Sequence, residues 1–172
     1  MFLENVFRTL NKYRVNYLVV GGVASVLYGN PRFTKDLDIL VDSKTKNLKK
    51  LIKAFSDLKF VPRVPVKPEE FISEENRRKW KEEKGMLAFT FINPRKAFEV
   101  VDILTESPFP FKKAYGRKTF FALGTIRVPT IGREDLIHMK QKAGRIQDLQ
   151  DIEILKAVRF SERQSNAKQT KK

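Results

Sequence analysis

Val20-Gly21-Gly22, followed by Arg32-Phe33-Thr34-Lys35-Asp36-Leu37-Asp38-Ile39, is the stretch that decides how this chain folds. The glycine pair ends an apolar run, residues 17–20, which predicts a buried strand, and it precedes a short helix predicted over residues 22–28. A turn from strand to helix through glycines lets bare backbone N–H groups approach an anion. Taken alone, the glycine pair would suit a tight turn with no ligand equally well.

Two aspartates lie in the apolar run that follows. Residues 37–41 are apolar and β-branched, which predicts a strand. Alternate residues of a strand share a face, so Asp36 and Asp38 project together while Leu37 and Ile39 face a core. Neighbouring carboxylates repel each other, and a divalent cation relieves the repulsion. Mg²⁺ takes one or two carboxylates with phosphate oxygens and water, and two such ions can clamp an in-line phosphoryl transfer. The alternative is a strand end with solvated acids.

In this order and spacing, the two motifs resemble the signature of the nucleotidyltransferase superfamily, which has the polymerase-β-like fold. The form with Arg-x-Thr before the acids resembles the branch that includes toxins of type IV toxin–antitoxin (abortive infection) systems. The resemblance implies that Gly21, Gly22, Arg32 and Thr34 contact the nucleotide. Some members carry Ser at the second glycine, so this chain lacks one hydroxyl contact to phosphate. Arg32 could instead form a structural ion pair with Asp36.

The family pattern also requires a third carboxylate on a later strand. Residues 98–104 form a strand-like apolar run that contains Asp102. The resemblance therefore implies that Asp36, Asp38 and Asp102 are the catalytic and metal-binding residues, holding two Mg²⁺ ions. The alternative for Asp102 is an acid at a strand end that pairs with a basic neighbour.

The C-terminal part of the chain, residues 135–153, is similar to the helical end of the same branch. There, a lysine and a following acidic helix complete the nucleotide site. The match implies that Lys140 contacts the triphosphate. It also makes Asp148 and Asp151 candidates for site acids, without deciding which of them matters.

Composition limits the classes of function. The chain carries 35 Lys and Arg against 20 Asp and Glu, a formal net charge of +15, and no cysteine. Such a field attracts polyanions, so RNA and a nucleoside triphosphate are the expected partners; the alternative is a surface that serves solubility. The absence of cysteine excludes disulfides and thiolate metal sites and fits a cytoplasmic location. No apolar run is long enough to span a membrane, and the N-terminus has no secretory pattern.

The order of predicted elements indicates an α/β (α+β) fold. Besides the elements above, we expect helices over 2–13, 133–143 and 148–159, a hairpin formed by 87–92 and 98–104, and a strand near 125–128. These elements predict a mixed or antiparallel sheet flanked by helices, with the C-terminal helices closing the cleft. Residues 1–160 are expected to form a single nucleotidyltransferase-like domain, and residues 161–172 a basic, mobile tail.

These features together predict a Mg²⁺-dependent nucleotidyltransferase that passes a nucleoside monophosphate from a nucleoside triphosphate to an acceptor hydroxyl. The charge and the toxin-like motif favour RNA, such as a tRNA end, as the acceptor; an aminoglycoside or a protein hydroxyl are the other acceptors considered. The rival hypothesis is a non-catalytic module of the same fold that binds RNA or a protein. The toxin resemblance also implies a cognate antitoxin as a protein partner.

Overall fold

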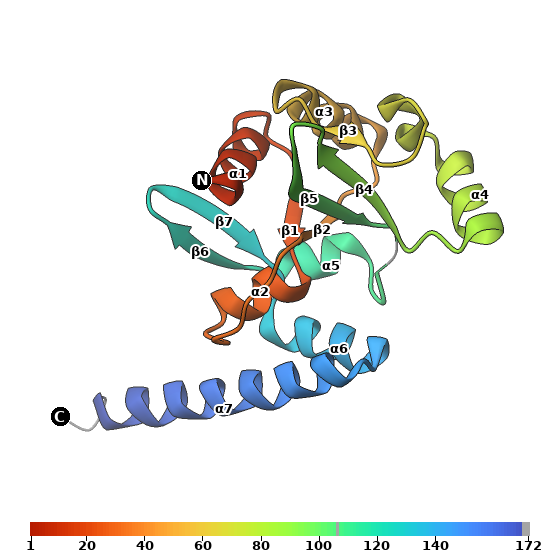
Figure 1. Cartoon of the computed structure of the whole chain (residues 1–172). Coiled ribbons are helices and arrows are strands. Elements are labelled where there is room, and N and C mark those ends of the chain that lie inside the picture. The colour runs from red at the N-terminus through yellow and green to blue at the C-terminus, as the bar shows by residue number, and fades with distance from the viewer. Residues whose placement is uncertain (106, 170–172) are drawn as a thin grey trace.

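The computed structural model describes residues 1–105 and 107–169 of the chain. Within them, the strands form one mixed seven-stranded sheet in the order β3-β4-β5-β2-β1-β7-β6 (Figure 1). The strands are β1 (Tyr17–Val19), β2 (Leu37–Val41), β3 (Val61–Pro62), β4 (Ala88–Asn93), β5 (Lys96–Leu104), β6 (Thr119–Leu123) and β7 (Ile126–Thr130). The helices are α1 (Phe2–Lys12), α2 (Gly21–Leu27), α3 (Thr45–Asp57), the 3₁₀ helix η1 (Pro68–Ile72), α4 (Glu74–Lys84), α5 (Phe111–Gly116), α6 (Arg133–Ala143) and α7 (Ile146–Gln169).

The centre of the sheet is made by the strands that carry the sequence motifs. β2 pairs with β1 in antiparallel register and with β5 in parallel register. Leu37 and Ile39 of β2 are fully buried, as alternation along a strand requires. The predicted mixed sheet with flanking helices is therefore confirmed.

The helices gather at two places around the sheet. α1 and α3 pack against each other on one side, and each buries an apolar stripe at helical spacing; the stripe of α3 comprises Leu48, Leu51, Ile52 and Phe55. α6 and α7 lie together at the opposite end of the molecule, where β1 and β2 meet α2 (Figure 1). This arrangement leaves the loop between α2 and β2 beside the two C-terminal helices.

The C-terminal helix is longer than the sequence pattern predicts. α7 continues through Gln169, so most of the tail expected over 161–172 has a helical backbone, and residues 170–172 lie outside the described residues. Among the described residues, no helix combines the length and apolar character that a membrane span requires.

Candidate active site

Asp38 and Asp102 face each other across the centre of the sheet. They are register partners on the adjacent parallel strands β2 and β5, so their side chains leave the sheet on the same face. Asp36 lies one residue before β2. All three aspartates line one cavity of about 380 Å³, a size typical of small-ligand sites. The structure thus brings together the three carboxylates that the sequence motifs single out.

The Asp38 carboxyl lies in a strained electrostatic environment. Burial raises its pKa to about 6, and repulsion from Asp102 and Asp36 adds to the shift, while a hydrogen bond from the Gly22 N–H opposes it. Asp102 is held in place by Thr90 of β4, whose Oγ1 donates a hydrogen bond of 2.6 Å to Asp102 Oδ1. Negative charge is therefore concentrated here, and the positive charge of Arg145 offsets part of the repulsion.

The two glycines are needed for close approach rather than for general flexibility. Gly21 has a φ of +61°, and a Cβ atom there would lie 2.0 Å from Asp38 Oδ2. A Cβ at Gly22 would lie 2.3 Å from Thr34 Oγ1 and 2.5 Å from Arg32 Nη2. No real Cβ tolerates these distances. The Asp38 side chain on β2 therefore occupies the space beside Gly21, and side chains of the loop before β2 occupy the space beside Gly22.

Arg32 is anchored from α7. Its Nε lies 3.2 Å from Asp151 Oδ1 as an ion pair, although the geometry is not that of a hydrogen bond. Asn30 Nδ2 donates to the same oxygen at 2.7 Å. The alternative ion pair with Asp36 is not the one the structure forms. Thr34 lies against Gly22 and lines the same cavity as the three aspartates.

Lys140 lines the site, but its ammonium group is engaged within the protein. The residue is 4% exposed, and its Nζ lies 2.5 Å from Asp151 Oδ2 and 3.3 Å from Asp148 Oδ1. Arg145 Nε donates to the other Asp148 oxygen at 2.7 Å. Asp148 and Asp151 thus act first as partners of cations, and Lys140 joins α6 to α7.

Two functional candidates were not assigned a role from the sequence. The sequence pattern does not indicate a role for Thr90, because its partner Asp102 lies on the next strand of the hairpin. Only the β4–β5 register brings the two residues together. Arg145 precedes α7, its side chain is 77% exposed, and it lines the cavity next to Asp38 and Asp102. The run 140–148, with its spaced basic and acidic residues, was the available signal for Arg145.

The donor set suits a hard divalent cation. Within the described part of the chain, no three His, Cys, Asp or Glu side chains converge closely enough to enclose a metal ion by themselves. Mg²⁺ does not require such a cage, because it takes one or two carboxylates and completes its shell with phosphate oxygens and water. Burial is the main cause of the raised pKa of Asp38 and repulsion from Asp102 and Asp36 adds to it, so a bound cation would stabilise the ionised carboxylate.

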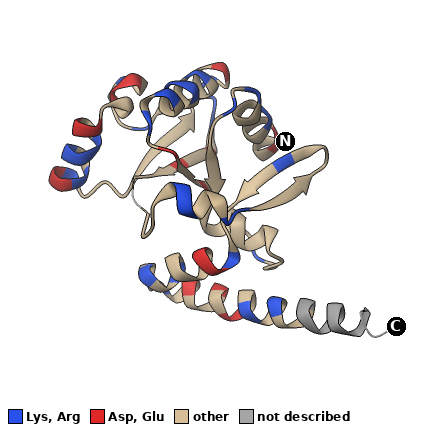
Figure 2. Cartoon of the chain, turned by 180° about the vertical axis from the view of Figure 1, so that it is seen from behind, with Lys and Arg blue, Asp and Glu red and all other residues tan. Residues whose placement is uncertain are grey.

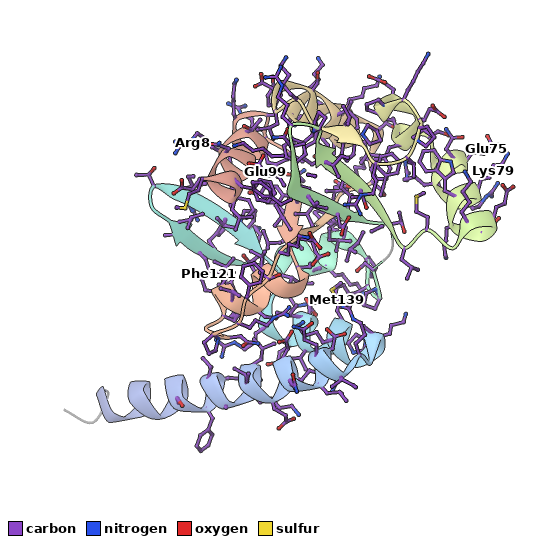
Figure 3. All side chains as sticks on the ribbon, in the orientation of Figure 1. Arg8, Glu75, Lys79, Glu99, Phe121 and Met139 are labelled. Atoms are coloured by element: carbon purple, nitrogen blue, oxygen red, sulfur yellow. The ribbon has the colours of Figure 1, made fainter. Side chains whose placement is uncertain are left out.

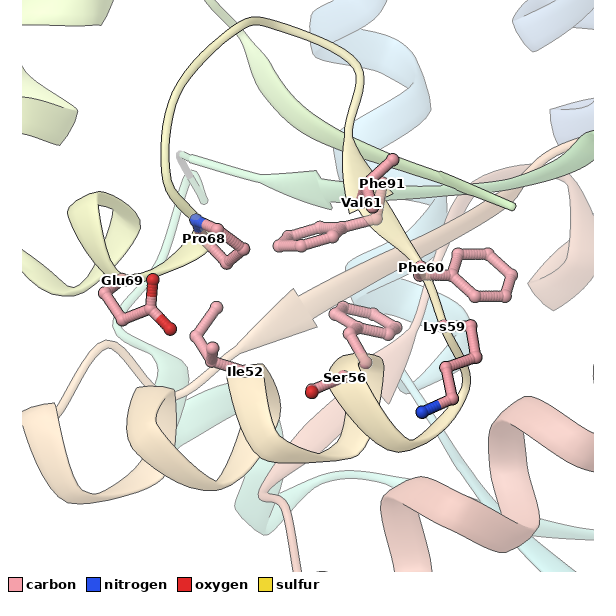
Figure 4. Close-up of a pocket in the computed structure, with 9 residues that line it drawn as sticks. Ile52, Ser56, Lys59, Phe60, Val61, Pro68, Glu69 and Phe91 are labelled. Carbon is pink, nitrogen blue, oxygen red and sulfur yellow. The ribbon is translucent and has the colours of Figure 1, made fainter. Parts of the chain in front are cut away.

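A separate cavity lies away from the aspartates, between α3 and the chain segment that includes β3 (Figure 4). It shares no lining residue with the cavity beside Asp38. The rings of Phe55, Phe60 and Phe91 form its floor, and Phe55 and Phe91 have centroids 4.5 Å apart. Lys59 and Glu69 are the charged residues in its lining. This cavity is an extension of core packing and offers no group-transfer chemistry.

Comparison with solved structures finds nucleotidyltransferase folds. The chain is similar to the lincosamide antibiotic adenylyltransferase LnuA with lincomycin bound (16% identity, 91% of this chain and 96% of that chain, TM-score 0.60). It is also similar to a candidate nucleotidyltransferase of Thermotoga maritima (18%, 88% and 88%, TM-score 0.55). A third similar structure is the antibiotic-resistance factor ANT(2'')-Ia (12%, 98% and 93%, TM-score 0.53). At these identities the likeness shows a shared fold.

Comparison with known sequences identifies the family. No curated protein sequence gives a significant match. The sequence model of the AbiEii nucleotidyl transferase toxin of type IV toxin–antitoxin systems matches residues 6–169, which is nearly the whole chain. The match includes the glycine pair, the three aspartates and the cluster of α6 and α7 described above. The chain therefore belongs to the AbiEii family of nucleotidyltransferase toxins.

Proposed function

We propose that this protein transfers a nucleoside monophosphate from a nucleoside triphosphate to a hydroxyl at an RNA end, in a Mg²⁺-dependent reaction. The observation that supports the proposal most directly is the pairing of Asp38 with Asp102 in parallel register, with Asp36 beside them in one cavity. The family match adds the reaction class, because its members are nucleotidyltransferases.

Each carboxylate has a role in this proposal. Asp36 and Asp38 would hold Mg²⁺, and Asp102 would share a second ion. Bound Mg²⁺ neutralises charge on the phosphate oxygens and lowers the barrier to in-line displacement. Asp102, which accepts a hydrogen bond from Thr90, would take the proton of the acceptor hydroxyl. Most of the rate would come from positioning and charge neutralisation, as in phosphoryl transfer generally.

The polyphosphate would lie against the cations of the same cavity. Arg32, Lys35 and Arg145 line it together with the aspartates. Lys140 was expected to contact the triphosphate, but its Nζ is already paired with two carboxylates. We therefore assign Lys140, which is buried, to holding α7 against the site. Arg32 and Arg145 each pair with one carboxylate through Nε, which leaves other guanidinium N–H groups for phosphate, and Lys35 lines the same cavity.

The charge of the chain supports RNA as the acceptor. The net charge is +15, and Figure 2 shows Lys and Arg distributed over α3, α4 and α7 rather than confined to the site. A polyanion much larger than a nucleotide would be attracted to such a surface. The family description also implies regulation by an antitoxin, which would be the protein partner.

The proposal is tested by incubating the protein with each α-³²P-labelled nucleoside triphosphate and total RNA, with Mg²⁺ or with EDTA. We expect label on RNA only with Mg²⁺, and none from the Asp38→Asn variant. Asp57→Asn is the matched control, because it removes a carboxylate whose partner is Lys12, remote from the site. RNA binding without label transfer under every triphosphate would favour the non-catalytic module. Label on an added aminoglycoside or on protein, with none on RNA, would show that the acceptor is that molecule and not RNA.

A further inference from the structure

A second cavity, of about 470 Å³, meets the first at the Asp38–Asp102 pair, and its walls have the opposite character. The first cavity is polar, with Arg32, Thr34, Lys35 and Gln147 in its lining. Apart from the residues that the two cavities share and Gly21, the second is lined by aliphatic and methionine side chains alone. These are Leu87, Ala88, Leu104, Leu136, Met139 and Ala143.

The apolar wall is built by two elements that the fold brings together. Ala88 and Leu104 are register partners at the ends of β4 and β5, next to Asp102. Leu136, Met139 and Ala143 follow the i, i+3, i+7 spacing on α6, so they share one helix face. Met139, labelled in Figure 3, lies between α6 and the sheet. Together these residues form an apolar surface that ends at the carboxylates.

Leu87 makes the mouth of this cavity unusual. It is 70% exposed, although it directly precedes β4 and lines the cavity. It continues the apolar wall of the cavity to the rim, and ligand sites are lined mainly by apolar side chains. Most of the side chain is therefore available to a ligand.

In-line displacement decides which substrate each cavity receives. The attacking oxygen and the leaving pyrophosphate must lie on opposite sides of the α-phosphorus. The polar cavity, whose lining includes Arg32, Lys35 and Arg145, suits the anionic pyrophosphate portion. The attacking hydroxyl must then arrive from the other side, past Asp102 and the β4 edge, where the wall is apolar.

We propose that the apolar cavity is the acceptor subsite and that it takes the unpaired terminal nucleoside of a single-stranded RNA end; this inference rests on the proposed function. The base contacts the apolar wall that includes Leu87 and Met139, and the ribose hydroxyl is directed to Asp102. The hydroxyl oxygen bonds to the α-phosphorus, the bond from that phosphorus to the β-phosphate oxygen breaks, and pyrophosphate leaves. The hydroxyl proton passes to Asp102. A paired duplex end would not present its base to this surface.

Two variants test the subsite without touching the carboxylates. Leu87→Ser and Met139→Ala each remove apolar contact from the cavity, and each should raise the KM for an RNA oligonucleotide about tenfold. The Kd for a non-hydrolysable nucleoside triphosphate with Mg²⁺ should change less than twofold. Leu149→Ser is the control, because Leu149 is also exposed, lies on α7 and lines neither cavity. Its kinetic constants should match those of the wild type.

A higher Kd for the nucleoside triphosphate with an unchanged KM for RNA would overturn the proposal. The cavity would then hold the nucleoside of the triphosphate and not that of the RNA. Unchanged constants in both variants would overturn it as well. A readout without turnover separates this outcome from failure of the proposed function. An RNA oligonucleotide that ends in 4-thiouridine, photo-crosslinked to the wild-type protein with the non-hydrolysable triphosphate, should label peptides containing residues 87–88 or 136–143. Labelling confined to other peptides contradicts the subsite, whether or not the protein transfers label.

Discussion

Lys140 Nζ lies 2.5 Å from Asp151 Oδ2, inside a buried cluster that connects both C-terminal helices to the loop before β2. The same aspartate accepts a hydrogen bond from Asn30, 121 residues earlier in the chain, and pairs with Arg32. Arg32 in turn lies against Gly22 at the site. Asp151 therefore links α7 to Arg32, which lies beside the three aspartates.

Lys140→Met tests how much of the fold depends on this cluster. Removing Lys140 takes one partner from two buried carboxylates, which keep Arg32 and Arg145. We therefore expect a loss of up to about 3 kcal/mol in the free energy of unfolding, the lower end of the range for a broken buried ion pair. Urea denaturation, monitored by circular dichroism, measures the loss of unfolding free energy. Lys12→Met is the control, because the Lys12–Asp57 pair is exposed and should contribute little measurable stability. Equal urea midpoints for the two variants would refute the structural assignment of Lys140.

The strands that carry the three aspartates could be predicted because their signals are local, whereas the family resemblance was needed to assign Asp102 to the same site. The glycine pair, the alternation around Asp36 and Asp38 and the apolar run around Asp102 each act within a few residues. The hairpin of β4 and β5 was also expected, and its register with β2 places Asp102 beside Asp38. Local periodicity therefore sufficed for the elements that carry the carboxylates.

The rest depends on contacts that no local pattern shows. The spacing of residues 140–151 indicates a motif, but only the packing of α6 on α7 shows that Lys140 faces two aspartates. β6 was not expected, although residues 119–123 are mostly apolar. It is an edge strand whose regular pairing comes entirely from β7. Arg32 likewise pairs with Asp151, which lies near the other end of the chain.

Gly21→Ala separates a steric requirement from a backbone requirement. The new Cβ would displace the Asp38 carboxylate, so we expect transfer activity to fall at least about 100-fold. Gly124→Ala is the matched control, because Gly124 has a φ of +58° and no atom within 4 Å of its added Cβ. Both variants should lose about 1–2 kcal/mol of stability from the positive φ. Similar activity in the two variants would show that the approach to Asp38 is unimportant.

Asp38→Asn should stabilise the metal-free protein in a pH-dependent manner. The pKa of Asp38 is about 6 in the fold against an ordinary 3.8, so the ionised carboxylate opposes folding. The wild type therefore loses stability as pH rises through this interval, and the loss is complete above about pH 6. We expect the variant to be more stable by about 1–3 kcal/mol at pH 8 in EDTA, with little difference near pH 4.

Urea titrations at several pH values measure this difference. Asp57→Asn should show only a slight effect, in the opposite sense, because hydrogen bonding to Lys12 lowers the pKa of Asp57 but the pair is exposed to solvent. The slight support from the ionised form of Asp57 is present above the unfolded pKa and disappears as pH falls through the lower folded pKa. A stability gain from Asp38→Asn that is the same at pH 4 and pH 8 would contradict the electrostatic origin.

Thr90→Val tests whether the hydrogen bond to Asp102 positions that carboxylate for chemistry. Valine keeps the shape of threonine but cannot donate the 2.6 Å hydrogen bond, so Asp102 gains freedom to rotate. We expect kcat to fall about 10- to 100-fold, in line with the loss of a hydrogen bond to a charged group, while the KM for the nucleotide stays within twofold. Thr90→Ser retains the hydroxyl and should recover most of kcat at an unchanged melting temperature. If serine and valine gave the same kcat, the hydroxyl would have no positioning role, and the orientation of Asp102 would have to come from its strand register with Asp38 alone.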